Sequence, residues 1–186
     1  MVEIVQELTE GWDYDAISIG YPGLVGNQGP SSEPGNLGPG WVGFDFSSAF
    51  GLPVRIMNDA AMQALGSYEG GRMLFLGLGT GVGSALITEE VILTLELGQL
   101  PYKRWETLGE ALGRQGLKQL GKTAWRRVVM DVAPALMKAF LADSVVIGGG
   151  NAKKLKELPP GVRQSHTLTA FRGGFRLWDT GTVPHA

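Results

Sequence analysis

Short apolar runs alternate along the chain with segments of helical periodicity. Four such runs end in glycine, proline or aspartate, which predicts buried strands at 15–23, 53–59, 73–79 and 144–150. The stretches 82–88 and 91–97 predict a hairpin joined at Glu89 and Glu90. Strands that alternate with helices predict an α/β fold, and the hairpin makes one sheet mixed rather than purely parallel.

Helical patterns fill the intervals between these strands. Residues 60–71 predict a helix that Gly70 and Gly71 terminate. A longer pattern starts near 106 and, after a break at Gly121, continues to about 142, with a kink expected at Pro134. Its apolar stripe consists of Trp125, Val128, Val129, Val132, Leu136 and Phe140. Shorter helices are expected at 151–158 and 169–179.

Composition removes several classes of function. The 186 residues carry 16 basic and 18 acidic side chains, and the resulting net charge of −2 argues against general nucleic-acid binding. No apolar run approaches the ~20 residues that a membrane span needs. The acidic start lacks the pattern of a signal peptide, so a cytoplasmic protein is expected by default. Without cysteine there is no disulfide and no thiolate metal site.

Glycine-rich loops are the first candidates for chemistry, since the chain has 29 glycines. The loop at 76–86 places glycines at alternate positions around Thr80, which leaves backbone N–H groups free to bind phosphate oxygens. Its spacing fits neither the dinucleotide fingerprint nor a Walker A loop. A tight hairpin turn is the alternative. The glycines after the strand at 144–150 either accept the flat face of a base or sugar, or only turn the chain into a helix.

Asn58 and Asp59 follow a predicted strand directly and precede a helix. An aspartate there is either a helix N-cap or a general base that accepts a proton from a substrate hydroxyl. The Gly/Pro/Ser/Asn segment at 24–40 is too long for a plain connector, which indicates a functional loop.

Five motifs, taken in order, resemble those of the ROK sugar kinases and most of all their polyphosphate glucokinase-like branch. They are IGYPG (19–23), EPGNLGPGW (33–41), PVRIMNDAA (53–61), LGLGTGVGSAL (76–86) and VIGGG (146–150). The resemblance implies an actin-like ATPase (ribonuclease H-like) fold with mixed sheets and two lobes. Residues 1–70 would form the first lobe, 71–170 the second, and 171–186 a terminal helix and tail. The first lobe is expected to be truncated, because the family's Asp-x-Gly-Gly-Thr phosphate loop is not found.

The resemblance also implies roles for single residues in phosphoryl transfer from ATP or polyphosphate, with Mg²⁺, to the 6-hydroxyl of glucose or a related hexose. Asp59 would be the catalytic base. The sugar-binding residues would be Asn36, Asn58, Glu96 and Glu110. Phosphate and nucleotide would bind at Gly79, Thr80, Gly81, Gly148, Gly149 and Gly150. No protein metal site is implied, and Gln99 stands where the family has a histidine.

Three further expectations complete this interpretation. A sugar-binding remnant without catalysis is the alternative function, and a ROK transcriptional regulator is disfavoured because no helix-turn-helix segment precedes the motifs. Basic residues recur every four positions and offer a possible polyphosphate contact at Arg114, Lys118, Lys122 and Arg126. Self-association, as a homodimer or larger assembly, is expected through the strand at 15–20.

Overall fold

The computed structural model describes residues 1–34, 37–89, 91–166 and 168–179. The chain forms two compact units, Met1–Asp59 and Ala60–Ala186. Within the described residues, no helix has the length and apolarity needed to cross a membrane.

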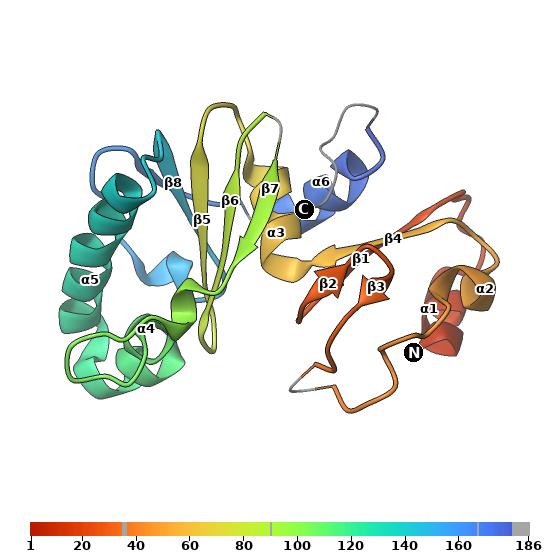
Figure 1. Ribbon diagram of the computed structural model, residues 1–186, viewed down its shortest axis with the longest axis horizontal. Helices are drawn as coiled ribbons and strands as arrows, with labels where there is room; N and C mark the ends of the chain where they lie inside the picture. The colour runs from red at the N-terminus through yellow and green to blue at the C-terminus, as the bar shows by residue number, and fades with distance from the viewer. Residues whose placement is uncertain (35–36, 90, 167, 180–186) are drawn as a thin grey trace. The chain divides into compact units, whose positions relative to one another are not determined.

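Unit 1 contains a parallel pair of strands, a small hairpin and two short helices (Figure 1). β1 pairs with β4 from Ile17 opposite Val54 to Tyr21 opposite Asn58. Buried Tyr21, Phe46 and Met57 form the core. The elements are α1 (Val2–Leu8), β1 (Ile17–Tyr21), β2 (Val25–Gly26), β3 (Gly29–Pro30), α2 (Phe46–Phe50) and β4 (Val54–Asn58). The strands predicted at 15–23 and 53–59 are confirmed, whereas α1 has no counterpart in the sequence analysis.

Unit 2 is built on a five-stranded sheet with the order β7-β6-β5-β8-β9. β5, β6 and β7 are antiparallel neighbours, and β5, β8 and β9 run parallel, so the predicted mixed sheet is confirmed. The strands are β5 (Met73–Leu78), β6 (Val82–Ile87), β7 (Ile92–Leu95), β8 (Ser144–Gly148) and β9 (Val162–Gln164).

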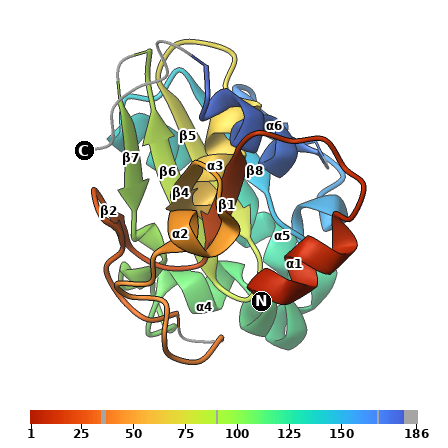
Figure 2. The same ribbon diagram turned by 90° about the vertical axis from the view of Figure 1, so that its right-hand side faces the viewer.

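Helices cover both faces of this sheet. α5 lies on one face, and α3 and α6 lie on the other (Figures 1 and 2). Because β5 is buried between these layers, its side chains are apolar on both sides and fully enclosed. The helices are α3 (Asp59–Ser67), α4 (Leu108–Leu112), α5 (Arg114–Ala139) and α6 (Thr169–Arg176), with 3₁₀ turns η1 (Leu97–Gln99) and η2 (Ala152–Lys154).

The apolar stripe predicted for the long helix is the part of α5 that packs on the sheet. Trp125, Val129 and Val132 are buried in the core cluster, and the other three members of the stripe are half-buried against it. Gly121 breaks the helix, as predicted, with φ 72° and ψ 166°. The kink expected at Pro134 is not seen in the backbone torsions, which stay helical around it.

The helix expected at 151–158 was a wrong prediction. Only the turn η2 forms, and Leu155 is already extended with φ −79° and ψ 130°. Pro159 and Pro160 bar helical torsions only at the end of the expected segment, because the restriction acts on the residue directly before a proline, and nothing in the structure explains the extended torsions already at Leu155. The chain then adds β9 to the sheet beside β8.

Candidate functional site

Asn58 and Asp59 lie at the carboxyl end of the parallel pair β1–β4, the edge at which open α/β sheets bind ligands. The side-chain amide of Asn58 donates a 3.1 Å hydrogen bond to the carbonyl of Gly23, so it ties the end of β4 to the loop that follows β1. Asp59 is exposed and is the first residue of α3. Acidic side chains are favourable at the positive end of a helix dipole, and Asp59 is the acidic residue of the first turn of α3.

A carboxylate closes the long loop predicted to be functional. Glu33 accepts hydrogen bonds from the backbone N–H groups of Trp41 at 3.0 Å and Val42 at 3.3 Å. The Trp41 N–H is the main reason that the pKa of Glu33 lies below its ordinary value. Asn36, the predicted sugar ligand, falls outside the described residues. Glu33 was not identified from the sequence, because the residues around it give no sign that its carboxylate binds backbone N–H groups eight residues away.

We expect Glu33→Gln to open this loop. A neutral amide accepts weaker hydrogen bonds than a carboxylate, so the Trp41 and Val42 amides should exchange with solvent faster, whereas exposed Glu10→Gln should leave them unchanged. Because the folded pKa of Glu33 is lowered, its contribution is complete above 4.5 and is lost as the pH falls through the folded value. NMR-detected exchange would measure both effects, and unchanged rates in the variant would contradict the role.

The predicted phosphate loop is the exposed turn between β5 and β6. The Gly79 N–H donates to the Gly81 carbonyl at 3.0 Å. A side chain at Gly79 or Gly81 would meet no atom within 4 Å, so both positions are open to a ligand on their outer side. The Thr80 carbonyl accepts from the Arg114 N–H at 3.2 Å, so the first residue of α5 supports the turn.

The second glycine loop, after β8, is bound directly to the first. Asn151 makes two hydrogen bonds that join them. Its backbone N–H donates to the Leu78 carbonyl at 3.0 Å, and its side-chain amide donates to the Gly79 carbonyl at 2.9 Å. Lys154 Nζ in turn donates to Asn151 Oδ1 at 3.0 Å. Asn151 is buried, so this link is internal. Sequence analysis did not single out Asn151.

A cavity of about 260 Å³ opens beside this second loop, wholly within unit 2. Gly148, Gly149 and Gly150 line it together with the cationic Lys153 and with His166, to which the sequence analysis gave no role. Bare backbone next to a lysine suits an anionic or phosphorylated ligand.

Glu96 and Glu110 belong to two neighbouring elements, since the turn η1 packs on α4. Glu96 is exposed immediately before η1. Glu110 is half-buried, and its carboxylate accepts the Glu106 N–H at 3.2 Å while Thr107 Oγ1 accepts the Glu110 N–H at 3.2 Å. Glu110 therefore helps to cap α4.

Comparison with known proteins places these features in context. No family model matches the chain. The polyphosphate glucokinase of Mycobacterium leprae is 26% identical over 208 residues, which cover 100% of this chain and 64% of that protein. The polyphosphate glucokinase of Mycobacterium tuberculosis is 25% identical over 177 residues, covering 86% and 66%. The chain thus spans slightly less than two thirds of the length of these relatives.

Solved structures share the fold. The inorganic polyphosphate/ATP-glucomannokinase from an Arthrobacter strain has a TM-score of 0.73 at 20% identity, covering 93% of this chain and 78% of that one. The ROK family glucokinase of Streptomyces griseus, solved with glucose and AMPPNP, has a TM-score of 0.64 at 15% identity, covering 95% and 86%. The expected actin-like α/β fold is confirmed by these similarities.

Proposed function

We propose that the chain is a ROK sugar kinase and that the complete protein phosphorylates the 6-hydroxyl of glucose or a related hexose, because the chain is similar to polyphosphate glucokinases in sequence and shares the fold of a polyphosphate/ATP-glucomannokinase. The phosphoryl donor is ATP or polyphosphate. The observation that carries the proposal is the direct link between the two glycine loops through Asn151, which holds two bare backbone segments in one place for a phosphorylated donor.

The family resemblance assigns a role to each candidate residue. Asp59 accepts the proton of the sugar hydroxyl as its oxygen attacks the terminal phosphorus, and ADP or a shortened polyphosphate leaves. Asn58, Asn36, Glu96 and Glu110 are assigned to the sugar. The backbone of Gly79, Thr80 and Gly81 binds the transferred phosphate, and Gly148, Gly149 and Gly150 border the remainder of the donor.

Mg²⁺ would neutralise charge on the donor phosphates. Among the described residues, no three histidine or acidic side chains gather to hold a metal ion. Mg²⁺ commonly binds through substrate phosphates with one or two carboxylates. The glycine loops would therefore bind the phosphoryl donor as its Mg²⁺ complex.

The test is to measure sugar binding and turnover on the same preparation of the complete protein. Calorimetry with glucose and a coupled assay with each donor should both be positive for a kinase. The sugar-binding remnant is the second candidate, and Gln99, in the place of the family's histidine, favours it. Binding without turnover by either donor would contradict the kinase and support the remnant.

Donor choice can be tested through the basic residues of α5. Arg114, Lys118 and Lys122 are exposed, but Gly121 divides the series, and Arg126 Nε donates to the Lys154 carbonyl at 2.6 Å. If polyphosphate binds there, its affinity should fall steeply with salt, and Lys118→Gln with Lys122→Gln should flatten that dependence. Lys138→Gln, on the far end of α5, is the control. A salt-independent affinity would exclude this contact.

Self-association is also part of the proposal. A two-stranded sheet is only marginally stable on its own. Among the described residues, β1 pairs with β4 alone. Ile17 and Ile19 on β1 are only half-buried. We expect the 186-residue polypeptide to form dimers or larger species in light scattering. A monomer at all concentrations would contradict this expectation.

A further inference from the structure

Helices α3 and α6 cross in direct backbone contact. A Cβ atom on Gly66 of α3 would lie 1.8 Å from the Thr169 carbonyl oxygen, and one on Gly173 of α6 would lie 1.9 Å from the Met62 carbonyl oxygen. Neither position can hold any other residue unless the helices separate. The distance between α3 and α6 is therefore fixed at the place where the two helices cross.

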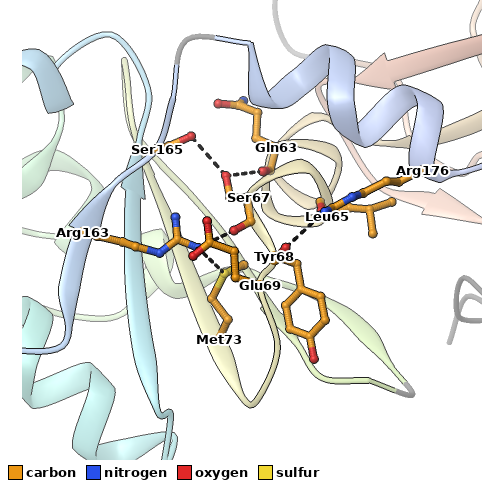
Figure 3. Close-up of polar contacts among 9 residues, drawn as sticks. All are labelled: Gln63, Leu65, Ser67, Tyr68, Glu69, Met73, Arg163, Ser165 and Arg176. Carbon is orange, nitrogen blue, oxygen red and sulfur yellow. Dashed lines mark hydrogen bonds and ion pairs between the residues drawn. The ribbon is translucent and has the colours of Figure 1, made fainter.

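Two arginines from outside α3 bind the last carbonyls of that helix and the carbonyl of the residue that follows it (Figure 3). Arg176 Nη1 donates to the carbonyls of Leu65 at 2.7 Å and Tyr68 at 2.8 Å, and Arg163 Nη2 donates to the Ser67 carbonyl. The final carbonyls of a helix lack partners within it and carry partial negative charge, so cations are favourable there. α3 has no basic residue in its own last turn, which leaves this role to β9 and α6.

A chain of hydroxyl groups adds a third connection. Ser67 Oγ lies 3.1 Å from Ser165 Oγ, which lies 2.7 Å from Thr169 Oγ1 (the first of these contacts is drawn in Figure 3). Ser67 and Thr169 are buried and Ser165 is half-buried, so these contacts are partly shielded from water. The carboxyl-terminal half of α3 is thus held by backbone contact, by charged hydrogen bonds and by hydroxyl groups.

The far end of the same helix carries Asp59. Its nine residues rise about 1.5 Å each, so Asp59 lies about 12 Å from the held end. A tilt of about 5° at that end would move the Asp59 carboxylate by about 1 Å, and a displacement of that size lowers the rate of a positioned reaction by about 10²-fold. If Asp59 is the catalytic base, the opposite end of α3 must therefore be held rigidly.

We infer that Arg176, assisted by Arg163, is a positioning residue for phosphoryl transfer. Its hydrogen bonds fix the last turn of α3. The orientation of α3 in turn sets the direction from which the Asp59 carboxylate approaches the sugar hydroxyl. This inference rests on the proposed function. Arg176 touches neither sugar nor donor in this account, so its loss affects the rate of the chemical step more than the binding of either substrate.

The experiment compares Arg176→Gln, Arg176→Lys and Arg163→Gln with Arg172→Gln, an exposed arginine of α6 that serves as a control. In the complete protein, Arg176→Gln should lower kcat about 10- to 100-fold with the KM for glucose changed less than about threefold. Arg176→Lys should restore part of the rate, Arg163→Gln should have a smaller effect, and Arg172→Gln should have none. The amides at the end of α3 should lose hydrogen-exchange protection in the same order.

Two outcomes separate this inference from the proposed function. If the parent enzyme turns over and Arg176→Gln keeps its kcat, or loses activity only in proportion to its folded fraction, the positioning role is wrong and the kinase stands. If the parent enzyme binds hexose without any turnover, the proposed function fails, and the positioning role fails with it.

Discussion

Asp59→Asn should lower kcat by about 10²- to 10⁴-fold while the KM for glucose changes little, the loss typical of removing a general base. The substitution keeps the size of the side chain, and asparagine caps helices about as well as aspartate. Loss of the carboxylate, and with it of the proton acceptor, is therefore the main change at the start of α3. Steady-state kinetics with either donor would measure it.

The control for this variant is Asp13→Asn, which removes another exposed carboxylate of unit 1. It should leave kcat unchanged. An Asp59→Asn enzyme with full kcat would show that Asp59 is a helix cap and nothing more, and the base would have to be sought elsewhere.

Gly149→Ala should destabilise unit 2 by about 2–5 kcal/mol of unfolding free energy. Gly149 has φ 81°, a conformation that side chains strain, and an added Cβ would lie 2.5 Å from the Leu78 carbonyl oxygen. The substitution would push apart the two glycine loops that Asn151 joins. Thermal unfolding followed by circular dichroism would measure the loss.

Its neighbour provides a matched control. A Cβ on Gly150 would meet nothing within 4 Å, so Gly150→Ala should change stability by less than about 0.5 kcal/mol. Gly150 lines the cavity nevertheless, so this variant should raise the KM for the donor without affecting folding. Equal stability of the two variants would contradict the role given to Gly149.

The elements with the strongest periodicity could be predicted from the sequence. The strands around Phe75 and Val146 and the α5 stripe around Trp125 contain fully buried apolar residues, and the strand around Ile19 contains half-buried ones, so an apolar pattern marks each of them. β9 could not be predicted, since it is a short edge strand whose residues are mostly polar.

The candidate site divides in the same way. Asp59 and the two glycine loops could be identified because their order along the chain resembles a known family. Glu33, Asn151 and Arg176 could not, because each acts on backbone groups that are distant in sequence and of no particular residue type. Such side chains carry no local pattern, and only the folded chain shows which carbonyl or N–H lies within their reach.

The most direct test of the proposed activity is the position of the phosphate on the product. The complete protein should convert glucose, in the presence of Mg²⁺ and ATP or polyphosphate, to glucose 6-phosphate, identified by ³¹P and ¹³C NMR. 6-Deoxyglucose, which keeps the other hydroxyls, should bind without being phosphorylated. A phosphate on any other hydroxyl, or phosphorylation of 6-deoxyglucose at an equal rate, would contradict the account.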